Sequence, residues 1–102
     1  MNAVPPSAPT DRSESDVHLY LVYSGQSAPV DGWEIEGSVF RASPHTCLVR
    51  TTLSRSRVYH AVKRQMRSPA PLMVAPLSAD PKFKDMAPGT LTWLRRTEPS
   101  RD

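Results

Sequence analysis

The residues of this sequence whose types and spacing are most suited to chemistry are cations. The stretch SRSRVYHAVKRQMR, residues 54–67, carries five Lys or Arg and no acid. Residues 37–79 contain seven Lys or Arg and no Asp or Glu, whereas residues 1–36 hold six acids and one Arg. Because guanidinium groups bind phosphate through paired hydrogen bonds, the middle of the chain could hold an extended anion.

Helical periodicity gathers these cations on one side. At 3.6 residues per turn, Arg57, His60, Arg64 and Arg67 fall in one arc, with Lys63 at its border. Val58, Tyr59, Val62 and Met66 fall in the opposite arc, so the pattern predicts an amphipathic helix. We expect contact with the backbone of DNA or RNA, or with another polyanion, through these side chains: Arg55, Arg57, His60, Lys63, Arg64 and Arg67, with Arg41 and Arg50 adding from the preceding hairpin.

The first turn of this helix is an unusual place for cations. Arg55 and Arg57 lie where the helix dipole is already positive, which disfavours each of them by about 0.3–1 kcal/mol. Free backbone N–H groups there, with Ser54 and Ser56, suit an anion such as phosphate. An alternative stays open, in which the arginines only form a solvated helix face. No helix-turn-helix, zinc-finger or RNP-type signature decides between the two interpretations.

Other reactive residues lack the partners that catalysis or metal binding needs. His45 and Cys47 form an isolated H-x-C pair, which favours a buried structural cysteine over a zinc ligand. Glu34 and Glu36 alternate as the solvent face of a strand would. The four glycines match no phosphate-binding loop, and no serine occupies a nucleophile elbow. We therefore expect no catalytic site, no metal site and no small-molecule cofactor, and we lean against an enzyme.

The elements that would position the cations come from short apolar runs. Residues 17–23 are β-branched and aromatic on both faces, which predicts a central strand. Residues 33–52 alternate and contain the turn RASPH, so they predict a hairpin with Glu36 opposite Arg50 and Val39 opposite Cys47. Thr52 or Ser54 would cap the helix, which Ser68 and the following prolines would end.

Two further segments complete the expected domain. LMVAPL, residues 72–77, predicts a strand in which Pro76 lies at the strand end or at a sheet edge, because proline lacks a ladder donor. Residues 90–96 predict either a last strand or a short helix capped by Thr90. The fold class is then α+β, with one sheet of four or five mainly antiparallel strands and one amphipathic helix on one face. The order resembles half of the ferredoxin-like fold, without its first helix, and this likeness carries no function.

A sheet covered by one helix leaves its second face open. Phe40 and Leu48 should point to that side, where exposed apolar surface would meet a partner. The alternative function is therefore a protein-interaction or assembly subunit that forms a homodimer or docks on another protein. A further possibility is that the segment near Trp93 folds over this face.

The composition sets the outer limits. Residues 1–16 are too polar to bury a core, so we expect a flexible tail there, one domain over 17–97 and a flexible end at 98–102. No apolar run is long enough to span a bilayer. The single cysteine excludes an internal disulfide, and we expect a cytoplasmic protein with no membrane partner.

Overall fold

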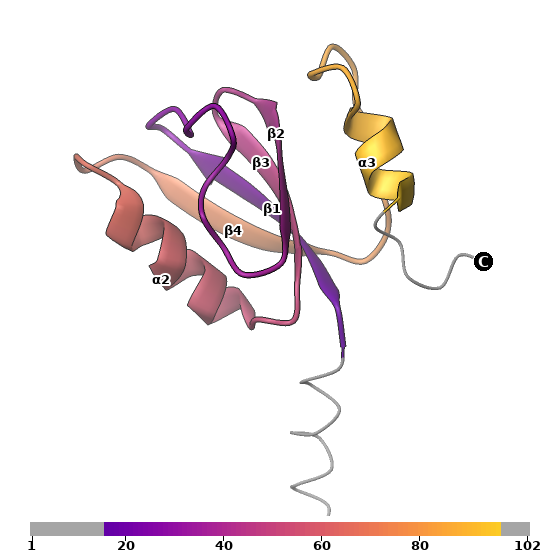
Figure 1. The fold of residues 1–102 in the computed structure, drawn as a ribbon. Coiled ribbons are helices and arrows are strands. Elements are labelled where there is room, and N and C mark those ends of the chain that lie inside the picture. Colours follow the sequence, from indigo (N-terminus) through magenta and orange to yellow (C-terminus); the bar gives the residue numbers. More distant parts are fainter. Residues whose placement is uncertain (1–15, 97–102) are drawn as a thin grey trace, which may run out of the picture.

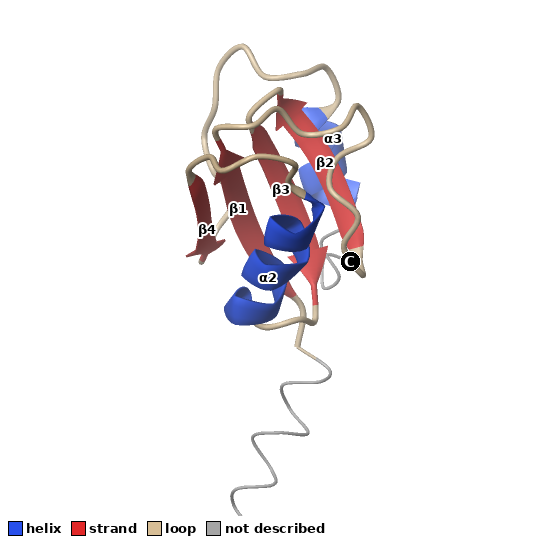
Figure 2. Ribbon diagram, turned by 90° about the vertical axis from the view of Figure 1, so that its left-hand side faces the viewer, coloured by secondary structure: helices blue, strands red, loops and turns tan. Residues whose placement is uncertain are grey.

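The computed structural model describes residues 16–96. The elements follow in the order β1 (His18–Ser24), β2 (Ser38–Ser43), β3 (Thr46–Thr51), α2 (Arg55–Gln65), β4 (Leu72–Leu77) and α3 (Thr90–Arg96). The strands form one antiparallel sheet with the order β2-β3-β1-β4 (Figure 2). This is the predicted α+β class. The expected tail over 1–16, apart from Asp16, and the expected C-terminal segment over 98–102 lie outside the described residues.

The first strand lies inside the sheet, as its sequence predicted. β1 pairs with β3 on one side and with β4 on the other. Its successive residues Leu19 and Tyr20 are both buried although they point to opposite faces. A strand that is apolar on both faces is stable only where both faces are covered, and this requirement puts β1 in the centre.

Two separate cores cover the two faces of the sheet. On one face, α2 and the segment 25–37 pack Val58, Val62 and Trp33 against the sheet. On the other face, Leu94 of α3 packs against Leu19 and Leu48. Figure 1 shows α2 and α3 on opposite sides of the strands. The expectation of one helix on one face was therefore incomplete, and of the two alternatives for residues 90–96 the helix is observed.

The hairpin exists, but its predicted register was wrong by two residues. Arg50 pairs with Ser38, not Glu36, and Val39 pairs with Val49. The turn consists of Pro44 and His45 alone, so the strands extend closer to it than a loop centred on Ser43 allows. A shift of two keeps each side chain on its expected face, and therefore the alternation in β2 and β3 still holds.

The predicted strand over residues 33–37 is a loop. Gly37 has φ of 121°, a conformation that favours glycine, and a Cβ there would collide with the carbonyl oxygen of Arg50. Gln65 then ties this loop to α2, because its side chain accepts a bond from Glu34 N–H at 2.9 Å and donates one to Glu34 O at 2.8 Å. Trp33 is buried against α2 as a result.

The connection from β3 through α2 to β4 crosses over β1. Both strands are antiparallel to β1, so they run parallel to each other with β1 between them. The described residues between β1 and β2 form turns and irregular structure instead of a helix. The likeness to half of a ferredoxin-like fold remains a prediction.

Candidate polyanion-binding surface

The orientation of α2 is fixed by its cap and by two valines. Ser54 is the N-cap, and its hydroxyl oxygen accepts a hydrogen bond from Arg57 N–H at 3.2 Å. Val58 and Val62 are completely buried against the sheet. A helix held by one capped end and two core contacts must present its opposite side to solvent.

That opposite side carries the predicted cations. Arg57, His60, Lys63 and Arg64 are all exposed. At 3.6 residues per turn they fall within an arc of about 120°. We call these four residues the α2 stripe.

No described carboxylate neutralises the α2 stripe. Among residues 16–96 the one ion pair joins Arg50 to Asp80, at 3.5 Å. Lys63 instead lies near the Tyr59 ring, with its ammonium nitrogen 5.9 Å from the centroid. Residues 37–79 contain no acid, and folding brings no described acid from elsewhere in the chain within ion-pair distance of the stripe. Its positive charges therefore face solvent.

Arg55 was predicted to bind the anion together with Arg57, but it lies on a different side of the helix. It is about 160° around the axis from Arg57, and its charge acts on the hydroxyl of Tyr20. Burial raises the pKa of Tyr20, and the nearby Arg55 guanidinium lowers it. The Tyr20 hydroxyl donates a hydrogen bond to Leu53 O at 2.9 Å. Because Arg55 acts on this hydroxyl, it lies near the junction between β1 and the helix.

Arg67 is exposed but does not continue the helical arc. The helix ends at Gln65, earlier than predicted, because Met66 has an extended backbone with ψ of 140°. Arg67 N–H donates to Gln26 Oε1 at 2.9 Å, a bond to the segment that follows β1. The Gln26 side chain thus accepts a backbone hydrogen bond just after the end of the helix, where a further helical turn was expected. No local sequence pattern indicates this contact, because the two residues are far apart in the chain.

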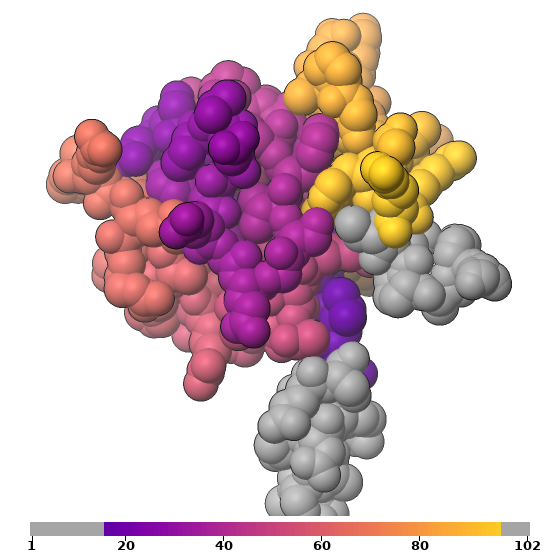
Figure 3. Space-filling model, in the orientation of Figure 1, coloured from indigo at the N-terminus to yellow at the C-terminus, as the bar shows by residue number. Residues whose placement is uncertain are grey.

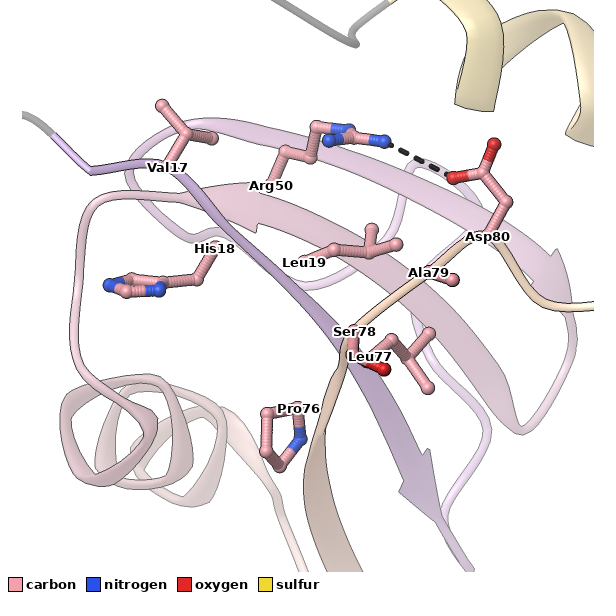
Figure 4. Close-up of a pocket in the computed structure, with 9 residues that line it drawn as sticks. All are labelled: Val17, His18, Leu19, Arg50, Pro76, Leu77, Ser78, Ala79 and Asp80. Carbon is pink, nitrogen blue, oxygen red and sulfur yellow. Dashed lines mark ion pairs between the residues drawn. The ribbon is translucent and has the colours of Figure 1, made fainter.

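The two hairpin arginines lie on different faces of the sheet, and Arg50 does not join the α2 stripe. Arg50 lies on the α3 side of the sheet, where its Nη2 approaches Leu94 O at 3.4 Å and Asp80. Figure 4 shows Arg50 directed toward Asp80, with His18 pointing to the opposite side of β1. Arg41 lies on the edge strand β2, close enough to Cys47 to affect its thiol. The expectation that both arginines extend the stripe was wrong for Arg50. Side chains alternate between the two faces along β3, and this alternation places Arg50 on the face opposite α2.

The residues proposed as a partner interface are packed within the chain. Leu48 is only 3 % exposed and contacts the core around Leu94. Phe40 is half-buried and stacks on Trp93 with ring centroids 5.9 Å apart. In Figure 3, α3 and the segment before it project from the sheet on the side away from α2. The short C-terminal helix thus takes the place that a partner was expected to fill.

The remaining reactive side chains have structural surroundings. Burial raises the pKa of the Cys47 thiol, against the smaller effects of the Trp33 backbone hydrogen bond and of Arg41. His45 contacts Ser24 O through Nδ1 at 2.9 Å. Residues 16–96 contain no group of three or more His, Cys, Asp or Glu that could hold a metal ion.

Sequence reasoning missed one feature next to the stripe. Tyr59 and Met66 were assigned to the buried arc, but both are only partly buried and line a hollow between α2 and β4. The hollow exists because β4 is the last strand of the described sheet, so no further strand within residues 16–96 covers the far side of the apolar arc. Helical periodicity identifies the apolar side of a helix. It does not tell how much of that side the sheet covers, because this depends on the tertiary structure.

Comparison with family models, with curated proteins and with solved structures found no match for this chain. Neither helix described in residues 16–96 is long and apolar enough to cross a bilayer. The function is therefore argued from the surface itself.

Proposed function

We propose that this protein is a small noncatalytic binding module that holds a nucleic-acid backbone on the α2 stripe. The observation that carries the proposal is the lack of any described carboxylate within ion-pair distance of four exposed residues on one fixed helix face. Phosphates spaced along a strand would be the natural counterions of such a row.

The first turn of α2 supports the same proposal. Arg57 occupies the third helical position after the Ser54 cap, and its N–H already bonds the cap hydroxyl. A Glu at this position would close a capping box and complement the helix dipole. An arginine here weakens the helix, so its presence is better explained by binding than by stability.

The Ser54 cap also limits the proposal. The hydroxyl of Ser54 uses one of the N–H groups that a phosphate at the helix start would need. Arg55 is turned away from the α2 stripe. The proposed contacts therefore run along the exposed side of α2, and the end of the helix contributes less than the sequence suggested.

The test is fluorescence anisotropy with labelled oligonucleotides over a series of salt concentrations. With Arg57, Lys63 and Arg64 each neutralising one phosphate of a single strand, the logarithm of the association constant should fall with a slope of about −2 against log salt. Arg57→Glu/Arg64→Glu should abolish most of this binding.

The matched control is Arg95→Glu/Arg96→Glu, which makes the same change in net charge on the exposed end of α3. It should bind nearly as well as the wild type, because α3 lies across the sheet. Equal losses in both double variants would mean that net charge alone governs binding, and the proposal would be wrong.

One observation favours a second candidate, an assembly subunit. Tyr23 and Met73 are neighbours across β1 and β4, and they are 40 % and 56 % exposed on the α3 side of the sheet. A second copy of the chain could cover this pair. Sedimentation should then show a dimer that Met73→Lys dissociates, whereas a monomeric wild type would dismiss this candidate.

A further inference from the structure

The hollow between α2 and β4 lies directly beside the α2 stripe. It has a volume of about 390 Å³, and its lining includes Tyr59, Lys63, Met66, Arg67, Pro69 and Leu72. Lys63 belongs to both the stripe and the hollow, so a ligand that follows the stripe passes the mouth of the hollow.

The floor of the hollow is apolar for a structural reason. Tyr59 and Met66 continue the arc that buries Val58 and Val62, but both are only partly buried and line the hollow next to Leu72 of β4, the last strand. The Tyr59 ring packs edge-on against His60 with centroids 5.1 Å apart, which restrains the ring from one side. An aromatic platform held in place loses little entropy when a planar group stacks on it.

The rim of the hollow is cationic. The Lys63 ammonium is 5.9 Å from the Tyr59 centroid, and Arg67 is exposed. Every residue of the lining lies in the part of the sequence that contains no acid. The hollow therefore suits a planar apolar group that is attached to a negative chain.

We infer that this hollow takes an unpaired nucleobase that stacks on Tyr59, and that the ligand of the module is single-stranded nucleic acid. The inference rests on the proposed function and adds the strandedness of the ligand to it. Successive phosphates would contact the α2 stripe while one base leaves the strand, the combination by which single strands are bound without sequence preference. In a duplex the bases are stacked and paired, so they cannot reach the ring without an added cost.

The test compares three labelled probes of equal length: oligo-dT, an abasic strand with the same phosphates, and a duplex. The wild type should bind oligo-dT about 5- to 100-fold more tightly than the abasic strand, the range that stacking of one base provides. Tyr59→Leu should lose this preference while its affinity for the abasic strand and its salt dependence stay unchanged. Tyr59→Phe should retain the preference because the ring remains.

A matched control is Phe83→Leu, which removes an exposed aromatic ring on the opposite side of the sheet. It should bind all three probes as the wild type does. Circular dichroism of each variant checks that the fold is kept.

Two results would overturn the inference while the proposed function stands. One is salt-dependent binding with equal affinity for oligo-dT and the abasic strand. The other is equal affinity of the wild type for the duplex and for oligo-dT. Failure of the wild type to bind any of the three probes at low salt would refute the proposed function itself, together with the inference.

Discussion

The two helices described in residues 16–96 solve the same packing problem with different charge patterns. α2 covers one face of the sheet with Val58 and Val62, and α3 covers the other face with Leu94. All three side chains are completely buried. As far as the core is concerned, the two helices are alike.

Their cations differ in position along the helix. α3 carries Arg95 and Arg96 in its last turn, where the dipole favours positive charge. α2 also has cations in its last turn, but Arg55 and Arg57 lie in the first turn, which contains no acid. The arginines of α3 need no explanation beyond helix stability. Arg57 at the start of α2 opposes helix stability and lies on the α2 stripe, which is why we assign binding to α2 alone.

The largest expected effect tests whether α2 is the helix on which the fold depends. Val62→Asp places an unpaired charge in the core and should lower the free energy of unfolding by about 3–5 kcal/mol. Urea unfolding followed by circular dichroism measures it. Lys63→Asp, one residue along on the exposed side, is the control and should change stability by about 0.5 kcal/mol or less. Similar losses in both would mean that the helix orientation described here is wrong.

A smaller effect is expected for the corresponding change in α3. Leu94→Ala should cost about 3 kcal/mol, within the usual range for truncation of a buried leucine. Trp93, which stacks on Phe40, should report the loosening of α3 through its fluorescence. Leu91→Ala lies in the same helix but 48 % exposed, and it should have little effect. Indistinguishable variants would show that α3 does not pack on the sheet in solution.

Opposite signs are expected when one arginine of each helix is reversed. Arg57→Glu should stabilise the protein by about 0.3–1 kcal/mol, because it relieves the first turn of α2 and allows a capping box with Ser54. Arg96→Glu should destabilise it by a similar or smaller amount. Thermal unfolding at low salt measures both changes. If Arg57→Glu destabilises the fold, the argument that binding, not stability, explains this residue fails.

Alkaline pH should affect the α2 side of the sheet first, through Cys47. Burial raises the pKa of this thiol above its unfolded value, so its contribution to stability is complete below the unfolded pKa. The contribution is lost as the pH rises through the folded pKa, from about pH 8.5 upward. The urea midpoint of the wild type should therefore fall relative to that of Cys47→Ala between pH 8 and 10.5. Parallel curves would contradict this expectation.

Much of the fold followed from local patterns. The central strand, a cap at Thr52 or Ser54 and the strand Leu72–Leu77 were all predicted, because each depends on the chemistry of adjacent residues. The hairpin register was predicted less well, since the turn at Pro44 and His45 is shorter than the sequence suggested. The loop around Gly37 was missed because its conformation is required by the approach of Arg50 from another strand.

The candidate site divides in the same way. The helical period placed Arg57, His60, Lys63 and Arg64 on one exposed side, since periodicity is a property of the chain itself. Alternation along the hairpin placed Arg50 on the same face as Leu48, away from the helix, but no local pattern indicated its ion pair with Asp80. None indicated the position of Arg67, which depends on a hydrogen bond to Gln26.

The sequence by itself determined that the middle of the chain is positive and that one helix displays much of that charge. Composition and a 3.6-residue period are enough for this result. Only the tertiary structure decided that α3 covers Phe40 and Leu48, and that Tyr59 and Met66 border a hollow. Both depend on which elements end up side by side, and contacts between residues far apart in the chain set that arrangement.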